Sequence, residues 1–181
     1  MLRRAALASL LILVACRTSL ETEPDAPPRA DAPAVDMVDA GPSATCIEAM
    51  SHSDLAFIED KIFKPGCVFQ SCHDGIGGGA GTLDLRASMS HAALVNVDAR
   101  TDADASPPGT YKLVVPMQPT QSYLMFLIRH YTAQEMSPEA GQPAADVGFM
   151  PQDNTGALPP LCIEKREAIV RWIEAGAPPR T

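Results

Sequence analysis

The chemically most distinctive residues of the sequence lie in one short segment, Cys67-Val68-Phe69-Gln70-Ser71-Cys72-His73. Two thiols can form thioether bonds to the vinyl groups of a haem, and an imidazole beside them can bind its iron. The usual spacing for c-type haem attachment places two residues between the cysteines, and here there are four. We predict that Cys67, Cys72 and His73 hold a covalent haem c, with the inserted residues bulging outwards.

Two other interpretations of this segment stay open. In an oxidising compartment, Cys67 and Cys72 could instead form a short-loop disulfide, with His73 an exposed neighbour. A metal site would need one more ligand, because zinc takes four clustered ones. No helpful spacing to the segment is offered by the other histidines, His52, His91 and His130. The sequence therefore favours zinc least.

The cysteine count bears on the same choice. The sequence contains five cysteines, and Cys16 is set apart by the leader described below. With Cys67 and Cys72 kept for haem, the economical scheme is a disulfide between Cys46 and Cys162. Four cysteines permit three pairings, so the sequence alone leaves the connectivity open.

Helical patterns surround these residues. Apolar periodicity and capping residues predict helices over 53–63, 88–95, 122–131 and 162–174. Ser53 and Ser88 are the expected caps of the first two. Pro65-Gly66 is expected to stop the first helix and Gly176 the last. Because the rest of the domain is loop with almost no strand, we predict an all-α domain.

Six short motifs occur one after another along the domain. They are Ile62–Cys67, Cys72–Gly75, Gly81–Leu85, Val115–Leu124, Met150-Pro151 and Ile169–Ala177. This order resembles the cytochrome c-like domains found in lipoproteins of myxobacteria and planctomycetes. The resemblance covers nearly all of residues 46–178 and implies a small, cytochrome c-like helical domain with long loops.

The resemblance also implies how the helices pack. In that family, a helix before the Cys-His segment packs against the closing Trp-Ile-x-x-Gly-Ala helix. In this chain the two helices are 53–63 and 163–174. Cys46 and Cys162, one beside each helix, would then lie close enough to form a disulfide.

A second haem ligand is implied by the same resemblance. In the family it is the methionine of a Met-Pro step shortly before the last helix, which is Met150 here. Histidine–methionine ligation raises the reduction potential of a haem. Met136 and then Met117 are the alternatives, and His130 would serve if no methionine does.

Residues 1–15 have the three parts of an export signal. Arg3 and Arg4 are followed by an apolar stretch and by Ala15. The ending Leu13–Cys16 resembles the lipobox of bacterial lipoproteins, which implies cleavage before Cys16 and lipid on its thiol. An ordinary cleaved signal is the alternative. Arg17, in place of Asp, resembles the pattern for sorting to the outer membrane.

Residues 16–45 are rich in Pro, Ala, Asp and Glu and lack apolar periodicity. We interpret them as a lipidated cysteine followed by a disordered tether. The formal net charge of −8 disfavours nucleic acid, which binds proteins through its phosphates.

Together these patterns predict a monohaem c-type electron carrier of the cell envelope. It would be anchored in the outer membrane by lipid, face the periplasm or the cell surface, and exchange electrons with redox partner proteins. We expect a carrier rather than an enzyme. The alternative is a haem-free envelope lipoprotein, stapled by a Cys67–Cys72 disulfide, with a binding or structural role.

Overall fold

A computed structural model of the chain describes residues 42–68, 72–76, 83–99, 111–143, 147–153, 156–157 and 159–181. These residues fall within one unit, Asp39–Thr181. The predicted export signal, the lipidated Cys16 and the tether up to residue 41 lie outside the described residues. In the part of the chain that is described, no helix is long and apolar enough to cross a membrane.

The closing helix α6, Ile163–Glu174, matches the predicted helix 162–174 to within one residue. Its face of Ile169, Trp172 and Ile173 is completely buried, with 0% exposure for each side chain. Gly176 then adopts a φ of +93°, the left-handed conformation in which helices commonly end and which glycine adopts without strain. The apolar face of α6 therefore forms the floor of the main core.

The short helix α1, Ala44–Ala49, packs on α6. A disulfide joins Cys46 of α1 to Cys162, the residue that precedes α6. Arg171 of α6 adds a second link, because its Nη2 donates to the Ala49 carbonyl at 2.7 Å. The predicted Cys46–Cys162 disulfide is thus confirmed.

The helical run before the Cys-His segment is longer than predicted. It consists of α2, Leu55–Phe57, the π-helical turn η1, Ile58–Phe63, and α3, Lys64–Gly66. Asp54 caps it by accepting from the Phe57 N–H at 2.8 Å, so the prediction of Ser53 as cap is wrong. Pro65 and Gly66 are the last two residues of α3, so the run ends at the predicted Pro65-Gly66 stop.

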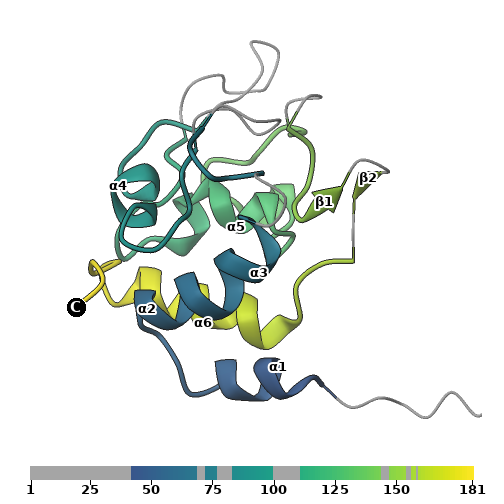
Figure 1. Ribbon diagram of the computed structural model, residues 1–181. Coiled ribbons are helices and arrows are strands. Elements are labelled where there is room, and N and C mark those ends of the chain that lie inside the picture. Colours follow the sequence, from purple (N-terminus) through teal and green to yellow (C-terminus); the bar gives the residue numbers. More distant parts are fainter. Residues whose placement is uncertain are drawn as a thin grey trace, which may run out of the picture. The chain divides into compact units, whose positions relative to one another are not determined.

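This run packs against α6 and closes the main core. Ile58 and Ile62 of the run are buried in the same apolar cluster as Ile169 and Trp172. Figure 1 shows α6 between α1 on one side and α2 with α3 on the other. The predicted packing of the helix before the Cys-His segment against the closing helix is confirmed.

The middle of the chain forms a second layer of short elements. It contains α4, Ser90–Leu94, the 3-10 turn η3, Pro119–Gln121, α5, Tyr123–Leu127, and the 3-10 turn η4, Ala133–Glu135. Val114 pairs with Val95 in an isolated parallel bridge. A second apolar cluster gathers here around Tyr123, Phe126 and Met136.

The elements of this layer differ from the sequence expectation, since α4 and α5 are shorter than the predicted helices 88–95 and 122–131. Ser88 does not cap α4, whose cap position is Met89 without a side-chain hydrogen bond. A short antiparallel hairpin also occurs, and each of its strands has two residues: β1, Gln152–Asp153, and β2, Gly156–Ala157. The described residues therefore form a mostly helical domain with long connections.

Candidate functional site

The two thiols of the Cys-His segment follow the end of the helical run. Cys67 comes directly after α3, and its N–H donates to the Phe63 carbonyl at 2.7 Å. Cys67 and Cys72 are half-buried and carry free thiols. Burial, and secondarily the nearby Cys72, raise the pKa of Cys67 to about 12. Cys67 is therefore an uncharged thiol at neutral pH with a second thiol close by.

His73 turns inward from this segment. It is 9% exposed, and its N–H donates to the Cys67 carbonyl at 3.1 Å, while its own carbonyl accepts from Leu85 at 2.9 Å. Burial lowers the pKa of His73, which favours the neutral imidazole. Its Nδ1 is buried and has no hydrogen-bond partner in the described structure. A buried nitrogen of this kind calls for a ligand or a water, and neutral imidazole is a common metal ligand.

A brace of charged residues fixes the turn after His73. Asp74 forms a backbone bridge with Asp84, and Arg86 donates to both carboxylate oxygens of Asp84, at 2.9 and 2.6 Å. These hydrogen bonds lower the pKa of Asp84. Gly75, at φ +73°, lies so close that an added Cβ would be 2.8 Å from the Asp84 side chain. Sequence reasoning missed this brace, although its Asp-Leu-Arg spacing was visible.

The three candidate methionines differ in their surroundings. Met150 is half-buried and packs against the main core, which the first thiol of the segment also borders. Its N–H donates to the Leu127 carbonyl at 2.8 Å, and its Sδ lies 3.7 Å from Gln152 Nε2. Met136 is buried in the second cluster, and Met117 is 70% exposed. Of the three, Met150 alone packs on the same core as the Cys-His segment.

The other histidines have protein partners. His52 Nδ1 lies 2.9 Å from Asp54 Oδ2, and His91 Nε2 lies 3.0 Å from the Ala177 carbonyl. His130 Nε2 is 3.7 Å from Glu167 Oε1. Each of these histidines is thus held in a local contact of its own.

One group of three possible metal-ligating atoms occurs among the described residues. It consists of Cys46, Cys162 and Glu164. Because the two cysteines form a disulfide, they present no thiolate to a metal. The imidazole of His73 therefore remains as the candidate ligand for a haem iron, and the thiols of Cys67 and Cys72 could attach the haem.

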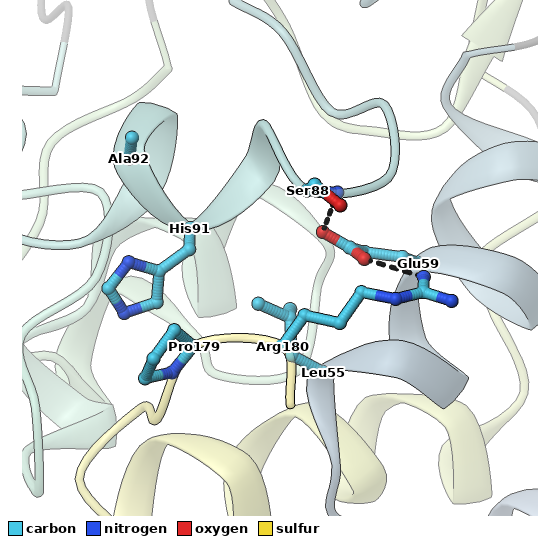
Figure 2. A pocket seen from close by; sticks show the side chains of 7 residues that line it. All are labelled: Leu55, Glu59, Ser88, His91, Ala92, Pro179 and Arg180. Carbon is cyan, nitrogen blue, oxygen red and sulfur yellow. Dashed lines mark hydrogen bonds and ion pairs between the residues drawn. The ribbon is translucent and has the colours of Figure 1, made fainter.

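A buried carboxylate lies elsewhere in the core, on the π-helical turn η1. Glu59 is 1% exposed, and its Oε1 accepts from Ser90 Oγ at 2.6 Å and from Ser88 N–H at 3.0 Å. Figure 2 shows Arg180 reaching Glu59 beside a pocket of about 190 Å³, with His91 on the opposite wall. Ser88, Ser90 and Arg180 all belong to the protein itself, and no local sequence pattern predicts these partners because they are distant along the chain.

Comparison of the chain with protein-family models, with curated proteins and with solved structures found no match. The proposal of a function therefore rests on His73 and the side chains around it.

Proposed function

We propose that the chain is a monohaem c-type electron carrier of the cell envelope with a cytochrome c-like fold. Cys67 and Cys72 would attach the haem, and His73 would bind its iron. The observation that carries the proposal is the buried neutral imidazole of His73, whose Nδ1 has no partner among the described residues, next to two free thiols. When bound, the haem would supply a one-electron redox couple.

The residues around the segment have definable tasks in this proposal. Two thioether bonds would keep the cofactor attached to an exported protein. The hydrogen bond from Leu85 to the His73 carbonyl restrains the backbone that carries the imidazole. The packing of the helical run on α6 gives that backbone a rigid base. Met150 is the proposed second ligand, held against the core by its bond to Leu127.

The envelope location belongs to the same proposal. Lipid on Cys16 would anchor the chain in the outer membrane, and the tether would let the domain reach redox partner proteins. Replacement of Cys16 by Ala should move the protein from the membrane fraction to the soluble periplasmic fraction. Retention of the Cys16→Ala protein in the membrane would overturn the anchor.

The decisive test is an absorption spectrum of protein exported together with the haem-maturation machinery. Dithionite reduction should give a sharp α band, and the colour should stay with the protein after acid–acetone extraction. The band should disappear in Cys72→Ala and His73→Ala. Cys16→Ala, which removes a cysteine outside the predicted haem-binding domain, is the matched control and should keep the band.

The second ligand has a test of its own. Met150→Leu should lower the reduction potential and remove the sulfur-to-iron charge-transfer band, because a thioether ligand raises the potential. Met117→Leu changes an exposed methionine and should leave both unchanged. An unchanged Met150→Leu spectrum would point to another ligand or to an open iron position.

A second candidate is supported by the closeness of the two thiols. Cys72 is near enough to raise the pKa of Cys67, so the pair could oxidise to a disulfide in an exported, haem-free protein. The chain would then be a binding or structural lipoprotein. A colourless protein whose peptide map joins Cys67 to Cys72 would establish this candidate and overturn the electron carrier.

A further inference from the structure

The residues that follow α6 carry a short sequence that occurs twice in the chain. Residues 177–180 are Ala-Pro-Pro-Arg, and the same four residues occur at 26–29 in the predicted tether. The copy at 177–180, which we call the tail, belongs to the described residues, whereas the copy at 26–29 lies outside them. The contacts of the tail therefore show which groups of the domain can hold a segment of this sequence.

The tail lies beside a pocket of about 190 Å³, with Pro179 and Arg180 in its wall. We call this space the Glu59 pocket. Its other lining residues come from α2, from η1 and from the segment 88–92, and are Leu55, Glu59, Ser88, His91 and Ala92. Figure 2 shows Pro179 near His91 and the side chain of Arg180 extended to Glu59. The tail thus crosses the pocket from one wall to the other.

Two side chains hold the backbone of the tail. His91 Nε2 lies 3.0 Å from the Ala177 carbonyl, which can only accept a hydrogen bond. Trp172 Nε1 donates to the Pro178 carbonyl at 2.8 Å. Because proline has no N–H, its carbonyl is the backbone group by which such a segment can be held. Prolines also favour an extended backbone in advance, so the segment loses little conformational freedom when it binds.

Charge complementarity selects the last residue of the tail. Arg180 Nη1 donates to Glu59 Oε2 at 2.9 Å, and its Nη2 donates to Asp60 Oδ2 at 3.2 Å. The Glu59 side chain is fully buried, and its other oxygen accepts from Ser88 and Ser90. A buried carboxylate needs a charged partner. The Glu59 pocket therefore favours an arginine at this place in the segment.

The attachment of the tail is exposed and carries a conformational cost. Pro178 and Pro179 are exposed, so the tail buries little apolar surface. Gly176 and Ala177 turn the chain back from α6 with φ values of +93° and +50°. The left-handed conformation is unfavourable for alanine. A segment that comes from another chain does not have to make this turn, which helps it to compete for the same contacts.

We propose that the Glu59 pocket is a recognition site for Ala-Pro-Pro-Arg segments, and that residues 26–29 of a second copy of this chain replace the tail there. Arg29 of the second copy then pairs with Glu59. The carbonyls of Ala26 and Pro27 accept from the two side chains that hold the tail carbonyls. This inference is independent of the haem, because none of the proposed haem-binding residues lines the pocket.

The position of the pocket favours a second copy over the tether of the same chain. The Cys46–Cys162 disulfide holds the start of the domain at the amino end of α6, whereas the tail leaves the carboxyl end. The twelve residues of α6 separate these ends by about 18 Å. The tail is also an internal competitor, present at a high effective concentration. Association between copies therefore depends on release of the tail.

The first test measures binding of a tether peptide, residues 23–31, to the full mature chain. The chain carries Cys16→Ala, so that it has no lipid, and Arg29→Gln, so that its own tether does not compete. With residues 178–181 removed, it should bind the peptide saturably and gain thermal stability. The same peptide with Arg29→Gln is the control and should bind at least tenfold more weakly. The tether peptide should also bind at least tenfold more weakly when the tail is intact.

A variant of full length guards against misfolding of the shortened chain. Arg180→Gln keeps both prolines of the tail and removes its charge, so it should bind the tether peptide more tightly than the chain with an intact tail. Absence of saturable binding to both variants, or equal binding of the peptide and its Arg29→Gln control, would overturn the proposal.

The indole N–H signal of Trp172 reports whether the peptide occupies the place of the tail. Trp172 is the only tryptophan of the sequence, so its indole gives a single signal in ¹H–¹⁵N spectra. Removal of residues 178–181 should shift this signal, because the Pro178 carbonyl is lost. The tether peptide should move it back towards its position in the intact chain. An indole signal that ignores saturating peptide would place the binding elsewhere and overturn the proposal.

Sedimentation velocity tests association between whole chains that carry Cys16→Ala. The chain without residues 178–181 should associate as its concentration rises, because each copy offers both a pocket and a tether. Arg29→Gln in this chain should keep it monomeric. The chain with an intact tail should associate at least tenfold more weakly. Peptide binding without association of the shortened chain would show that the tether does not serve a second copy, and would also overturn the proposal.

Discussion

Arg180 Nη1 donates to Glu59 Oε2 at 2.9 Å, although 121 residues separate the two in the sequence. The Glu59 side chain is fully buried and that of Arg180 is 31% exposed. The same tail is held by Trp172 Nε1, which donates to the Pro178 carbonyl at 2.8 Å. The carboxyl-terminal tail is therefore tied to the π-helical turn that leads towards Cys67.

Arg180→Ala should destabilise the domain by about 1–3 kcal/mol, because it leaves a buried carboxylate with only neutral donors. Asp60 receives the same guanidinium at 3.2 Å but is 47% exposed. Asp60→Ala is thus the matched control and should cost less than about 1 kcal/mol. Urea unfolding followed by Trp172 fluorescence measures both. Equal losses would mean that the contact of Arg180 with buried Glu59 stabilises the domain no more than its contact with exposed Asp60.

Removal of the Cys46–Cys162 disulfide should lower stability by about 2–5 kcal/mol, the usual cost for a bond that closes a long loop. The two cysteines lie 116 residues apart. The variant is Cys46→Ser with Cys162→Ser, measured by urea unfolding with and without a thiol reductant. In the haem-free protein, the reductant should not change the free energy of unfolding of the double variant. A remaining response would reveal a second disulfide, between Cys67 and Cys72.

The sequence was sufficient where the signals are local. Helix α6 could be bounded from its own residues, because its apolar face has the 3.6-residue period and Gly176 ends it. The Cys46–Cys162 disulfide followed from the choice of partners for four cysteines together with the family resemblance. In both cases, a few neighbouring or chemically unique residues carry the information.

The sequence was insufficient where the partners are distant. Glu59 accepts hydrogen bonds from Ser88 and Ser90, which lie 29 and 31 residues later, so no pattern near Glu59 predicts them. Ser88 was expected to cap its own helix because capping rules consider only neighbouring residues. They do not predict that its N–H donates to the distant carboxylate of Glu59. The backbone hydrogen bond from Leu85 to His73 is likewise not predicted by any local pattern around the histidine.

Gly75→Ala should disturb the turn after His73. The residue has a φ of +73°, and a new Cβ would meet Asp84 at 2.8 Å, so a loss of about 1–3 kcal/mol is expected. Haem content per chain should fall as well, if His73 binds the iron. Gly66→Ala is the matched control, because an added Cβ there meets nothing within 4 Å. Gly66→Ala should be neutral or stabilising by up to about 1 kcal/mol. A Gly75→Ala protein as stable as Gly66→Ala would show that the turn tolerates a side chain.

Acid should destabilise the domain through His130. Burial is the main cause that lowers its pKa, and Arg166 lowers it further, while Glu167 and Glu135 raise it. A histidine with a lowered pKa prefers to be neutral in the folded state. Above the unfolded pKa of about 6.5, both states are neutral and this preference costs nothing. As the pH falls below that value, the unfolded chain gains the proton first, so stability is lost towards the folded pKa.

The measurement is a proton NMR titration of the His130 ring, combined with urea unfolding at pH 7.5 and 5.5. Glu167→Gln should lower the His130 pKa further and steepen the acid loss, because it removes the main charge that favours protonation. Arg166→Gln should act in the opposite direction. His130→Gln should remove this part of the pH dependence altogether. A His130 pKa above about 6.5 in the folded protein would mean that the charge of Glu167 outweighs burial, and the acid loss attributed to His130 should then be absent.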